Sequence, residues 1–308
     1  LIKTAQFLEQ ARQSKKLGLD KAEVHYEYSD VMKRVQKIIK KIEPHDSRER
    51  YTELGVECMQ GAATITSPWT VTVDGTNGQQ EISARSIIVA AGASPVVPHL
   101  PNIDQIQYVT SDTIWDMKDL PKKLIVIGGG AIGCELAQAF KRLGSEVILI
   151  ESENRILIKE DSEVTETIEN QLTDEGVTVL TRHRAKGFIS EKGTQILVCD
   201  SPNGEVRLTF DVILFAIGRR ANINGYGLET IDAISGEDNN LPTNDFLETR
   251  YPNIYACGDV TGRMQFTHAA AHQAWHAVVN SLFGTFKKFP IDFSAVPWAT
   301  FTHPEIAR

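Results

Sequence analysis

A glycine-rich run between two apolar segments constrains this chain more than any other feature. An apolar stretch leads into Gly128, Gly130 and Gly133, which follow the pattern G-x-G-x-x-G. An amphipathic segment comes next, and a second apolar stretch follows it and ends in Glu151. Short apolar runs of this kind are typical of buried strands, and the segment between them has helical spacing. We therefore predict a strand, a helix and a strand, over residues 124–127, 131–143 and 146–150.

Each glycine of the run has its own physical role. Gly128 allows a tight turn, Gly130 lets the backbone approach a pyrophosphate, and Gly133 lets the helix pack closely on the strand. The phosphates would lie on the helix N-terminus, and Glu151 would accept a hydrogen bond from a ribose hydroxyl. The alternative is a glycine-rich turn in an ordinary βα unit, but here all parts of the motif occur in order. The run predicts a dinucleotide-binding site.

Length and charge limit the remaining possibilities. A chain of 308 residues is too long for one typical core, so we expect two or three domains. The formal net charge of −8 argues against nucleic acid or an anionic membrane as the main partner. No apolar run is long enough to span a membrane, so no membrane partner is predicted.

The four cysteines are Cys58, Cys134, Cys199 and Cys257, and they lie far apart in the sequence without a C-x-x-C pattern. This spacing predicts buried, inert thiols in a reducing cytoplasm. Cys134 falls in the first turn of a predicted helix, where a thiol pKa can be lowered, so its role stays open.

Two helices are predicted before the first strands, over 3–17 and about 31–42, and Pro44 ends the second. The polar face of the second helix is rich in lysine. This face could be a nucleic-acid patch, but a solvated helix face is the favoured interpretation in so acidic a chain.

A pattern of strands and turns occurs twice in the chain. Residues 87–92 close the first copy in an apolar strand and Ala-x-Gly, and they line up with residues 213–218 of the second copy. A complete strand–helix–strand unit precedes the second copy, whereas only helices precede the first. We therefore expect the corresponding unit of the first copy to lie upstream of Leu1. A later apolar strand, 254–257, places Gly258 and Asp259 at the carboxyl edge of a sheet, and a helix over 267–283 follows.

The order of these motifs resembles the flavoprotein disulfide reductases, a family that includes dihydrolipoamide dehydrogenase, glutathione reductase and mercuric reductase. The resemblance rests on G-x-G-x-x-G-x-E, on the paired Ala-x-Gly strands and on Tyr-Ala-Cys-Gly-Asp at 255–259. It is nearest to mercuric-reductase-like members, and it suggests a chain truncated at both ends. It implies an α/β fold with two Rossmann-like dinucleotide-binding domains. Electrons would pass from NAD(P)H to FAD, then to a redox disulfide, and finally to a small-molecule, small-thiol or metal-ion substrate in a cytoplasmic homodimer.

The resemblance also implies a division of the chain and a set of site residues. The first and second parts of an FAD domain would be 1–120 and 241–290, the NAD(P) domain 121–240, and the start of a dimerisation domain 291–308. The residues that line the nicotinamide dinucleotide would be Gly128, Gly129, Gly130, Ala131, Ile132, Gly133, Glu135, Glu151 and Gly218. Those that contact FAD would be Ala63, Ala91, Gly92, Asp259, Gln265, Phe266, Thr267 and His268. Glu135 would be catalytic, paired with a lysine beside the flavin.

The chain departs from the family pattern at several points. The C-x-x-x-x-C disulfide, its lysine and the glycine fingerprint of the FAD domain are absent. We therefore expect no reduction of a disulfide substrate by this chain, loss of FAD, and poor order in 1–120 and 241–308. The missing unit would also supply the strand against which 87–91 and 254–257 pair. His303 precedes a proline as in the family's catalytic histidine, but no acid follows in place, so no catalytic role is assigned to it.

Three further questions follow from the residues. His268, His272 and His276 share one helix face, which permits a metal site, but a flavin edge or solvent face is favoured and no metal is predicted. Glu151 and Glu153 put negative charge where a 2′-phosphate would lie, which favours NADH over NADPH. Two alternatives remain for the function: a free-standing NAD-binding module, and an inactive interaction domain that keeps the fold.

Overall fold

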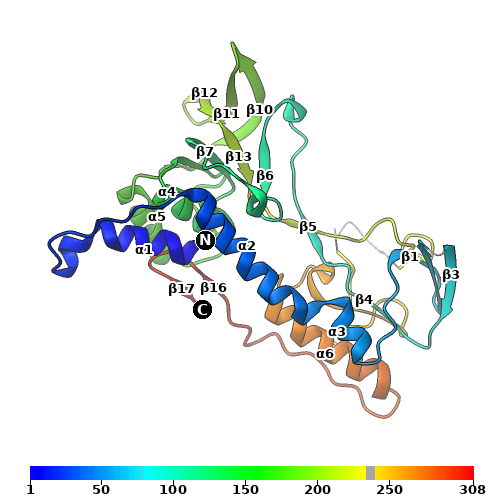
Figure 1. Ribbon diagram of the computed structural model, residues 1–308. Coiled ribbons are helices and arrows are strands. Elements are labelled where there is room, and N and C mark those ends of the chain that lie inside the picture. The colour runs from blue at the N-terminus through cyan, green and yellow to red at the C-terminus, as the bar shows by residue number, and fades with distance from the viewer. Residues whose placement is uncertain (77, 234–239) are drawn as a thin grey trace. The chain divides into compact units, whose positions relative to one another are not determined.

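The computed structural model describes residues 1–76, 78–233 and 240–308. The chain divides into two compact units, drawn in Figure 1. Unit 1 comprises Leu1–Glu43, Pro95–Gly218 and Ala299–Arg308, and unit 2 comprises Pro44–Ser94 and Arg219–Trp298.

Unit 1 is built on a five-stranded parallel sheet. Its strand order is β6-β13-β7-β8-β9. The bounds are β6 Tyr108–Thr110, β13 Val212–Phe215, β7 Lys123–Ile127, β8 Glu146–Ile150 and β9 Thr178–Leu180. The chain leaves β7 for β8 on one side and reaches β13 on the other side. The carboxyl ends of β7 and β13 therefore form the topological switch point, where open α/β sheets bind ligands.

Strand β7 is buried on both faces, as a central parallel strand should be. Its alternate residues belong to different layers. Leu124 and Val126 lie in a core cluster with Phe140, whereas Ile125 and Ile127 lie in a cluster with Phe188. The predicted strand, helix and strand are all confirmed, because helix α4 (Ala131–Arg142) follows β7 and precedes β8.

Helices form the layer that contains Phe140, and an antiparallel meander forms the layer that contains Phe188. The helices of unit 1 are α1 (Ile2–Arg12), α2 (Tyr28–Ile42), α4 and α5 (Ser162–Asp174), with 3-10 turns η1 (Ser14–Leu17), η3 (Ile103–Gln105) and η4 (Ile114–Asp116). The meander is β10 (Arg184–Glu191), β11 (Thr194–Ser201) and β12 (Gly204–Phe210), and a short hairpin, β16 (Ala299–Thr300) and β17 (Ile306–Ala307), closes the unit. The predicted helix over 3–17 is interrupted, since α1 ends at Arg12 and η1 follows it.

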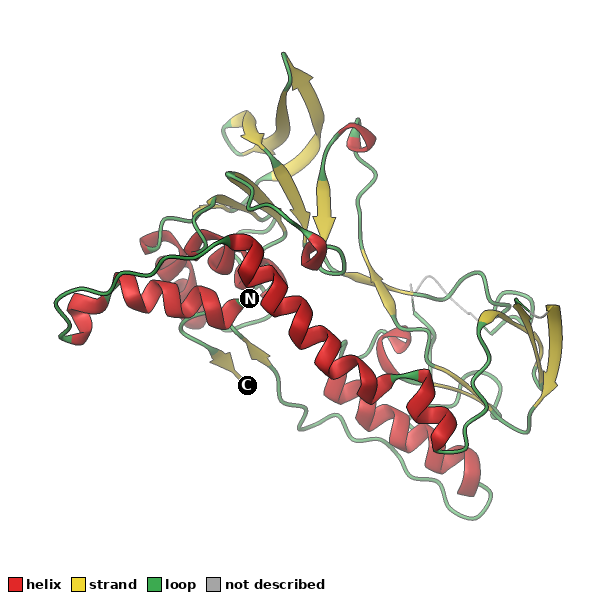
Figure 2. Ribbon diagram, in the orientation of Figure 1, coloured by secondary structure: helices red, strands yellow, loops and turns green. Residues whose placement is uncertain are grey.

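Unit 2 combines an antiparallel sheet, a parallel strand pair and a long helix, as Figure 2 shows. The antiparallel strands are β1 (Gly61–Ser67), β2 (Thr70–Gly75) and β3 (Gly78–Ser83). Its remaining elements are β4 (Ile87–Val89), β5 (Ala93–Pro95), β14 (Arg219–Ala221), β15 (Ile254–Ala256), α3 (Arg48–Glu53), α6 (Thr267–Phe283) and the 3-10 turns η2 (Glu43–Asp46) and η5 (Gly258–Thr261). The bounds predicted for α6 are confirmed at both ends, whereas α3 was not predicted.

Strands β4 and β15 pair with each other in parallel, with Ile254 opposite Ile87. The sequence predicted that both strands pair with a strand from another segment. For the edges at which β4 and β15 face each other that prediction is wrong, and for their opposite edges it stays a prediction. The Cys257 amide extends the pairing by donating to the Val89 carbonyl at 3.0 Å. Because the strands are parallel, the residues that follow them leave the sheet at the same edge.

The predicted fold class, an α/β fold with Rossmann-like parallel strands, is confirmed. The predicted division into FAD and NAD(P) domains stays a prediction, and the compact units follow different bounds, with 1–43 grouped with 95–218. Residues 234–239 of the predicted NAD(P) domain lie outside the described residues. No helix in the described part of the chain is long and apolar enough to cross a membrane.

Candidate functional site

The glycine turn after β7 has the geometry that its spacing predicted. Gly128 has a φ of 109°, and a Cβ there would lie 2.4 Å from the Ala216 carbonyl oxygen. A Cβ on Gly133 would lie 1.9 Å from the carbonyl oxygen of Gly128. Gly130 is different, because a Cβ at this position would meet nothing within 4 Å. Two glycines are therefore required by the protein's own packing, and the third borders open space.

That open space lies at the N-terminus of α4. Gly130 is the N-cap of the helix and supplies no side-chain cap, and Gly130, Ala131 and Ile132 are all exposed. The first intrahelical bond runs from the Cys134 amide to the Gly130 carbonyl at 3.0 Å. The earlier amides of a helix have no intrahelical acceptor, and together with the helix dipole they favour an anion. The first turn of α4 can therefore hold a phosphate.

Glu151 connects the end of β8 to the glycine turn. Its Oε2 accepts from the Gly129 amide at 2.7 Å, and its Oε1 accepts from the Glu153 amide at 2.9 Å and the Ser152 hydroxyl at 3.1 Å. A Cβ on Gly129 would lie 3.1 Å from this Oε2, so the fit is close. A carboxylate oxygen can accept more than one hydrogen bond. Glu151 thus stays able to accept from a further hydroxyl.

The third part of this edge comes from β13. The Ala216 amide donates to the Ile127 carbonyl at 2.8 Å, which continues the pairing of β13 with β7 beyond the strands. Gly218 follows with a φ of 116°, and a Cβ there would meet nothing within 4 Å. The structure therefore brings the glycine turn, Glu151 and the segment leading to Gly218 to one edge of the sheet.

Glu135, on the second turn of α4, is held by the C-terminal segment of unit 1. Its Oε1 accepts from the Phe301 amide at 2.8 Å. Burial raises the pKa of Glu135, and the bond from the Phe301 amide opposes that change. Among the described residues no ion pair to Glu135 is present. The proposed pairing with a lysine stays a prediction.

Cys134 is fully buried and its Sγ donates to the Gly129 carbonyl at 3.4 Å. Burial raises the pKa of this thiol far above its ordinary value, and the carboxylates of Glu135 and Glu151 add to the shift. The shift is opposite to the lowered pKa that a place in the first helical turn suggested, because the thiol is fully buried and lies near carboxylates. Burial likewise raises the pKa of Cys199, to about 12, and that of Cys257.

A second set of predicted residues lies in unit 2, around Asp259. The Asp259 carboxylate lies 3.8 Å from the Arg219 guanidinium, and both side chains remain about a quarter exposed, at 24% and 25%. Gln273, on α6, is fully buried and accepts from the Gly258 amide at 2.9 Å and the Thr261 hydroxyl at 3.2 Å. Gln273 therefore fixes the turn that carries Asp259. Sequence reasoning missed both Arg219 and Gln273.

The start of α6 carries four of the predicted FAD contacts, Gln265, Phe266, Thr267 and His268. The ring of Phe266 stacks with two others, that of His268 at a centroid distance of 5.5 Å and that of Trp298 at 6.3 Å. The His268 Nε2 lies 2.6 Å from the Pro297 carbonyl oxygen. This histidine therefore already has a polar partner.

The remaining predicted FAD contacts are small residues. Ala63 is exposed on β1, whereas Ala91 and Gly92 follow β4 at the edge that Asp259 also borders. Gly92 has a φ of 68°, and a Cβ there would meet nothing within 4 Å. Whether any of these residues contacts a flavin stays a prediction.

The histidines of α6 do not gather with further ligands. The rings of His272 and His276 lie 4.7 Å apart edge to face, and the His276 Nδ1 lies 3.2 Å from the Phe289 carbonyl oxygen. Within 1–76, 78–233 and 240–308, no three His, Cys, Asp or Glu residues are placed to hold a metal ion together.

Comparison with known proteins gives consistent matches over most of the chain. The sequence profile of the family described as pyridine nucleotide-disulphide oxidoreductase matches residues 4–274. A mercuric reductase of Streptomyces lividans is 34% identical over 264 residues, which are 84% of this chain and 55% of that protein. A dihydrolipoyl dehydrogenase of Chlamydia pneumoniae is 36% identical over 253 residues, which are 82% of this chain and 53% of that protein. The chain thus spans about half the length of these curated relatives.

A solved structure shares the fold. The HOCl-induced flavoprotein disulfide reductase RclA from Escherichia coli superposes with a TM-score of 0.81 at 24% sequence identity. The match covers 100% of this chain and 66% of that one.

Proposed function

Because this chain belongs to the pyridine nucleotide-disulphide oxidoreductase family, we propose that it binds a nicotinamide dinucleotide and FAD in an electron-transfer enzyme. Hydride would pass from the nicotinamide to the flavin, and electrons would then pass to a disulfide, a thiol or a metal-ion substrate. The dinucleotide would bind on the Gly128–Gly133 turn, and FAD would bind beside Asp259.

The observation that carries the proposal is the open approach to the N-terminus of α4. The turn is shaped by contacts at Gly128 and Gly133 that exclude any larger residue, while the space beside Gly130 is free. The amides of the first helical turn would hold a phosphate, and Glu151 would accept from a ribose hydroxyl. Gly218 would border the nicotinamide half, because it lies at the end of the neighbouring strand. When bound, the dinucleotide supplies the hydride.

Arg155, the first arginine after Glu151 in the sequence, supports a preference for NADH over NADPH. The Arg155 guanidinium donates to the carbonyls of Ile158 at 3.0 Å and Glu160 at 2.7 Å, and to the Thr165 hydroxyl at 2.9 Å. These bonds engage both terminal nitrogens, so Arg155 is not directed toward a 2′-phosphate. The carboxylate of Glu151 would also repel that phosphate.

Arg182 argues for the opposite preference. Its side chain is exposed, and its amide donates to the Glu153 carbonyl at 2.8 Å, beside the loop that follows Glu151. If NADPH bound more tightly, Arg182→Ala would reduce that preference. We propose that NADH is favoured, because two carboxylates lie on this loop.

For the flavin, we propose that Asp259 accepts a hydrogen bond from a ribityl hydroxyl. The side chains of Arg219 and Gln273 support this role, since one pairs with the carboxylate and the other holds its turn. The N-terminus of α6 would stabilise negative charge on the reduced flavin. Ala63, Ala91 and Gly92 would allow close approach of the cofactor, as residues with little or no side chain do.

The electron acceptor beyond FAD is proposed only by class. Mercuric reductase and dihydrolipoyl dehydrogenase are the names of the relatives, and they differ in what they reduce or oxidise. We assign no electron-transfer role to Cys134, Cys199 or Cys257, because all three are buried with raised pKa values. Formation of a homodimer and a cytoplasmic location are proposals that rest on the family resemblance alone.

Titration with NADH and NADPH, followed by nicotinamide fluorescence and combined with the absorbance spectrum of the purified protein, tests the proposal. We expect saturable NADH binding that is tighter than NADPH binding. Tighter NADPH binding would overturn the preference, and failure of both coenzymes to bind would overturn the site. NADH binding by a colourless protein would instead support a dinucleotide-binding module without flavin.

A further inference from the structure

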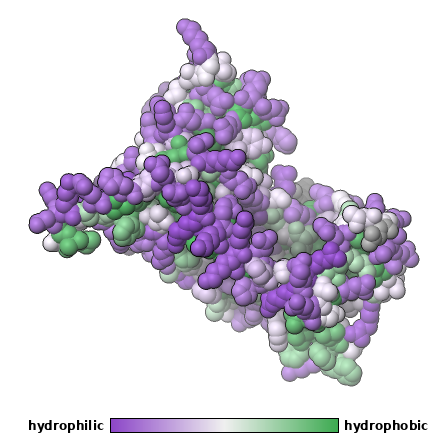
Figure 3. All heavy atoms as spheres, viewed as in Figure 1, coloured by the Kyte–Doolittle hydropathy of each residue, from purple (hydrophilic) through white to green (hydrophobic). Residues whose placement is uncertain are grey.

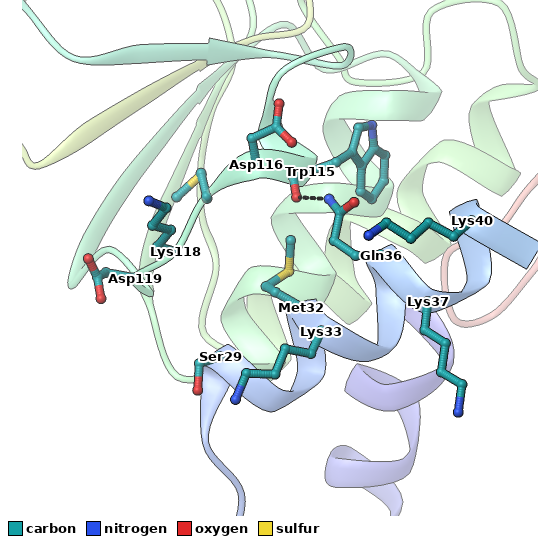
Figure 4. Close-up of a pocket in the computed structure, with 11 residues that line it drawn as sticks. Ser29, Met32, Lys33, Gln36, Lys37, Lys40, Trp115, Asp116, Lys118 and Asp119 are labelled. Atoms are coloured by element: carbon teal, nitrogen blue, oxygen red, sulfur yellow. Dashed lines mark hydrogen bonds between the residues drawn. The ribbon is translucent and has the colours of Figure 1, made fainter. Parts of the chain in front are cut away.

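A groove lies between α2 and the segment 115–119, within unit 1 and apart from the glycine turn. Its volume is about 770 Å³. Figure 4 shows Met32 and Gln36 extending from α2 toward this segment, with three lysines along the helix. None of its lining residues belongs to the proposed coenzyme sites.

The groove is formed by contacts that hold its two walls together. The Gln36 side-chain amide donates to the Trp115 carbonyl at 2.8 Å, and the Trp115 indole donates to the Ser111 carbonyl at 2.6 Å. Met32 and Met117 line the groove and are 5% and 9% exposed, so its floor is continuous with the core of the unit. The groove is therefore preformed, with an apolar floor.

One wall of the groove is positively charged. Lys33, Lys37 and Lys40 lie three and four residues apart on α2, so they share a helix face. The row extends over roughly 10 Å at 1.5 Å per residue. Lys33 bonds to Asp30 at 2.8 Å, whereas no ion pair to Lys37 or Lys40 is present among the described residues. Figure 3 shows hydrophilic side chains over this part of the surface.

The opposite wall has mixed charge. It carries Lys118 together with Asp116 and Asp119, and all three side chains are exposed. A uniformly anionic polymer would be attracted by α2 and repelled by these two aspartates. Nucleic acid carries a charge at every nucleotide and has no aliphatic side chain for the apolar floor, so it fits the groove less well than a peptide that alternates acidic and apolar side chains.

We infer that this groove binds a short acidic segment of a partner protein, with acidic side chains toward Lys37 and Lys40 and an apolar side chain on the Met32 floor. A row of separated ammonium groups suits several carboxylates spaced along a peptide, whereas a single small anion needs donors that converge. The apolar floor provides the burial that charge pairs at an exposed rim do not supply. The charge pattern of the two walls would fix the orientation of the peptide.

Fluorescence anisotropy with a labelled synthetic peptide, in which glutamate alternates with leucine, tests this inference. The test variant is Lys37→Glu combined with Lys40→Glu. The matched control is Lys15→Glu combined with Lys16→Glu, since these exposed lysines of η1 carry the same charge change away from the groove. We expect the test variant to bind about tenfold more weakly and the control to change by less than about twofold.

A second peptide, with lysine in place of each glutamate, separates charge recognition from damage to the fold. It should bind the test variant more tightly than the unchanged protein, because the charges are exchanged on both sides. NADH binding should be the same in all variants, which separates this inference from the proposed function. Equal loss of peptide binding in both double variants, tighter binding of a single-stranded oligonucleotide, or self-association lost in the test variant would each overturn the inference.

Discussion

The Glu151 carboxylate accepts a hydrogen bond from the Gly129 amide at 2.7 Å, so the residue expected to bind a ribose also fixes the loop expected to bind phosphate. Replacing Glu151 with Ala should therefore affect both functions at once. We expect NADH affinity to fall about tenfold or more, since hydrogen bonds to charged groups contribute roughly 1.5–3 kcal/mol. Fluorescence titration measures the loss. Glu153→Gln is the control, and a comparable loss there would show that only the local charge matters.

Two glycine variants should separate folding from ligand binding. Gly133→Ala places a Cβ 1.9 Å from the Gly128 carbonyl oxygen, so we expect a loss of stability of about 1–3 kcal/mol or more. Gly130→Ala is free of contacts and has a φ of −75°, so stability should be retained. Dinucleotide binding should nevertheless weaken, because the methyl group would occupy the approach to the helix. Urea unfolding and NADH titration measure the two effects, and an unchanged NADH affinity in Gly130→Ala would contradict the proposed pose.

The pH dependence of stability should report on Glu135. Burial raises the pKa of this carboxyl in the folded protein, so its contribution to stability is full below its ordinary pKa and is lost as pH rises through the raised value. Glu135→Gln keeps an acceptor for the Phe301 amide and removes the titration. We therefore expect the free energy of unfolding of the variant, relative to that of the unchanged protein, to be larger at pH 7 than at pH 4. Urea unfolding at both pH values measures the gain, and a gain equal at both would refute the assignment.

A buried ion pair should be much more important for stability than an exposed one. Arg142 and Glu175 are each 3% exposed, and the guanidinium donates to both carboxylate oxygens, at 2.7 and 2.6 Å. Glu175→Gln leaves the Arg142 charge buried without its partner, and we expect a cost of about 3–5 kcal/mol. Glu191→Gln removes one of the two acidic partners of the exposed Arg207, which also pairs with Glu205, and should cost less than about 1 kcal/mol. Similar costs in urea unfolding would contradict this contrast.

Gln273 should act on FAD binding without contacting the cofactor. Gln273→Ala removes the acceptor of the buried Gly258 amide, which should cost about 1–3 kcal/mol and loosen the turn that carries Asp259. Gln79→Ala, at an exposed position of β3, is the matched control. We expect only the first variant to bind added FAD more weakly than the unchanged protein, measured by titration with FAD. Equal FAD affinity in both variants would show that the turn does not depend on Gln273.

Local features of the fold could be predicted because their physical causes are local. The spacing of apolar residues predicted α4 and β8 within a residue, and the glycine pattern predicted where backbone atoms approach each other. The end of β8 also placed Glu151 at the carboxyl edge of the sheet. Its bond to Gly129 was not foreseen, because it depends on how two loops meet rather than on the pattern of either.

Features that depend on distant partners could not be predicted. Gln273 has the pattern of an ordinary helix residue, and its role depends on a turn 15 residues earlier. Arg142 lies on a predicted helix, but nothing in the sequence indicates that Glu175 lies beside it. The position of Cys134 in a first helical turn suggested a lowered pKa, whereas the packing around it produces the opposite shift. Burial of a side chain depends on the whole unit, which a motif does not describe.

Gln138 binds His303 through the main chain alone. Its side-chain amide accepts from the His303 amide at 2.8 Å and donates to the His303 carbonyl at 2.9 Å, while the imidazole side of the residue is left exposed. The attachment of the β16–β17 hairpin to α4 is therefore insensitive to the side chain at position 303. A change of that side chain leaves both hydrogen bonds in place, whereas the amide group of Gln138 is the member of the pair that the attachment requires.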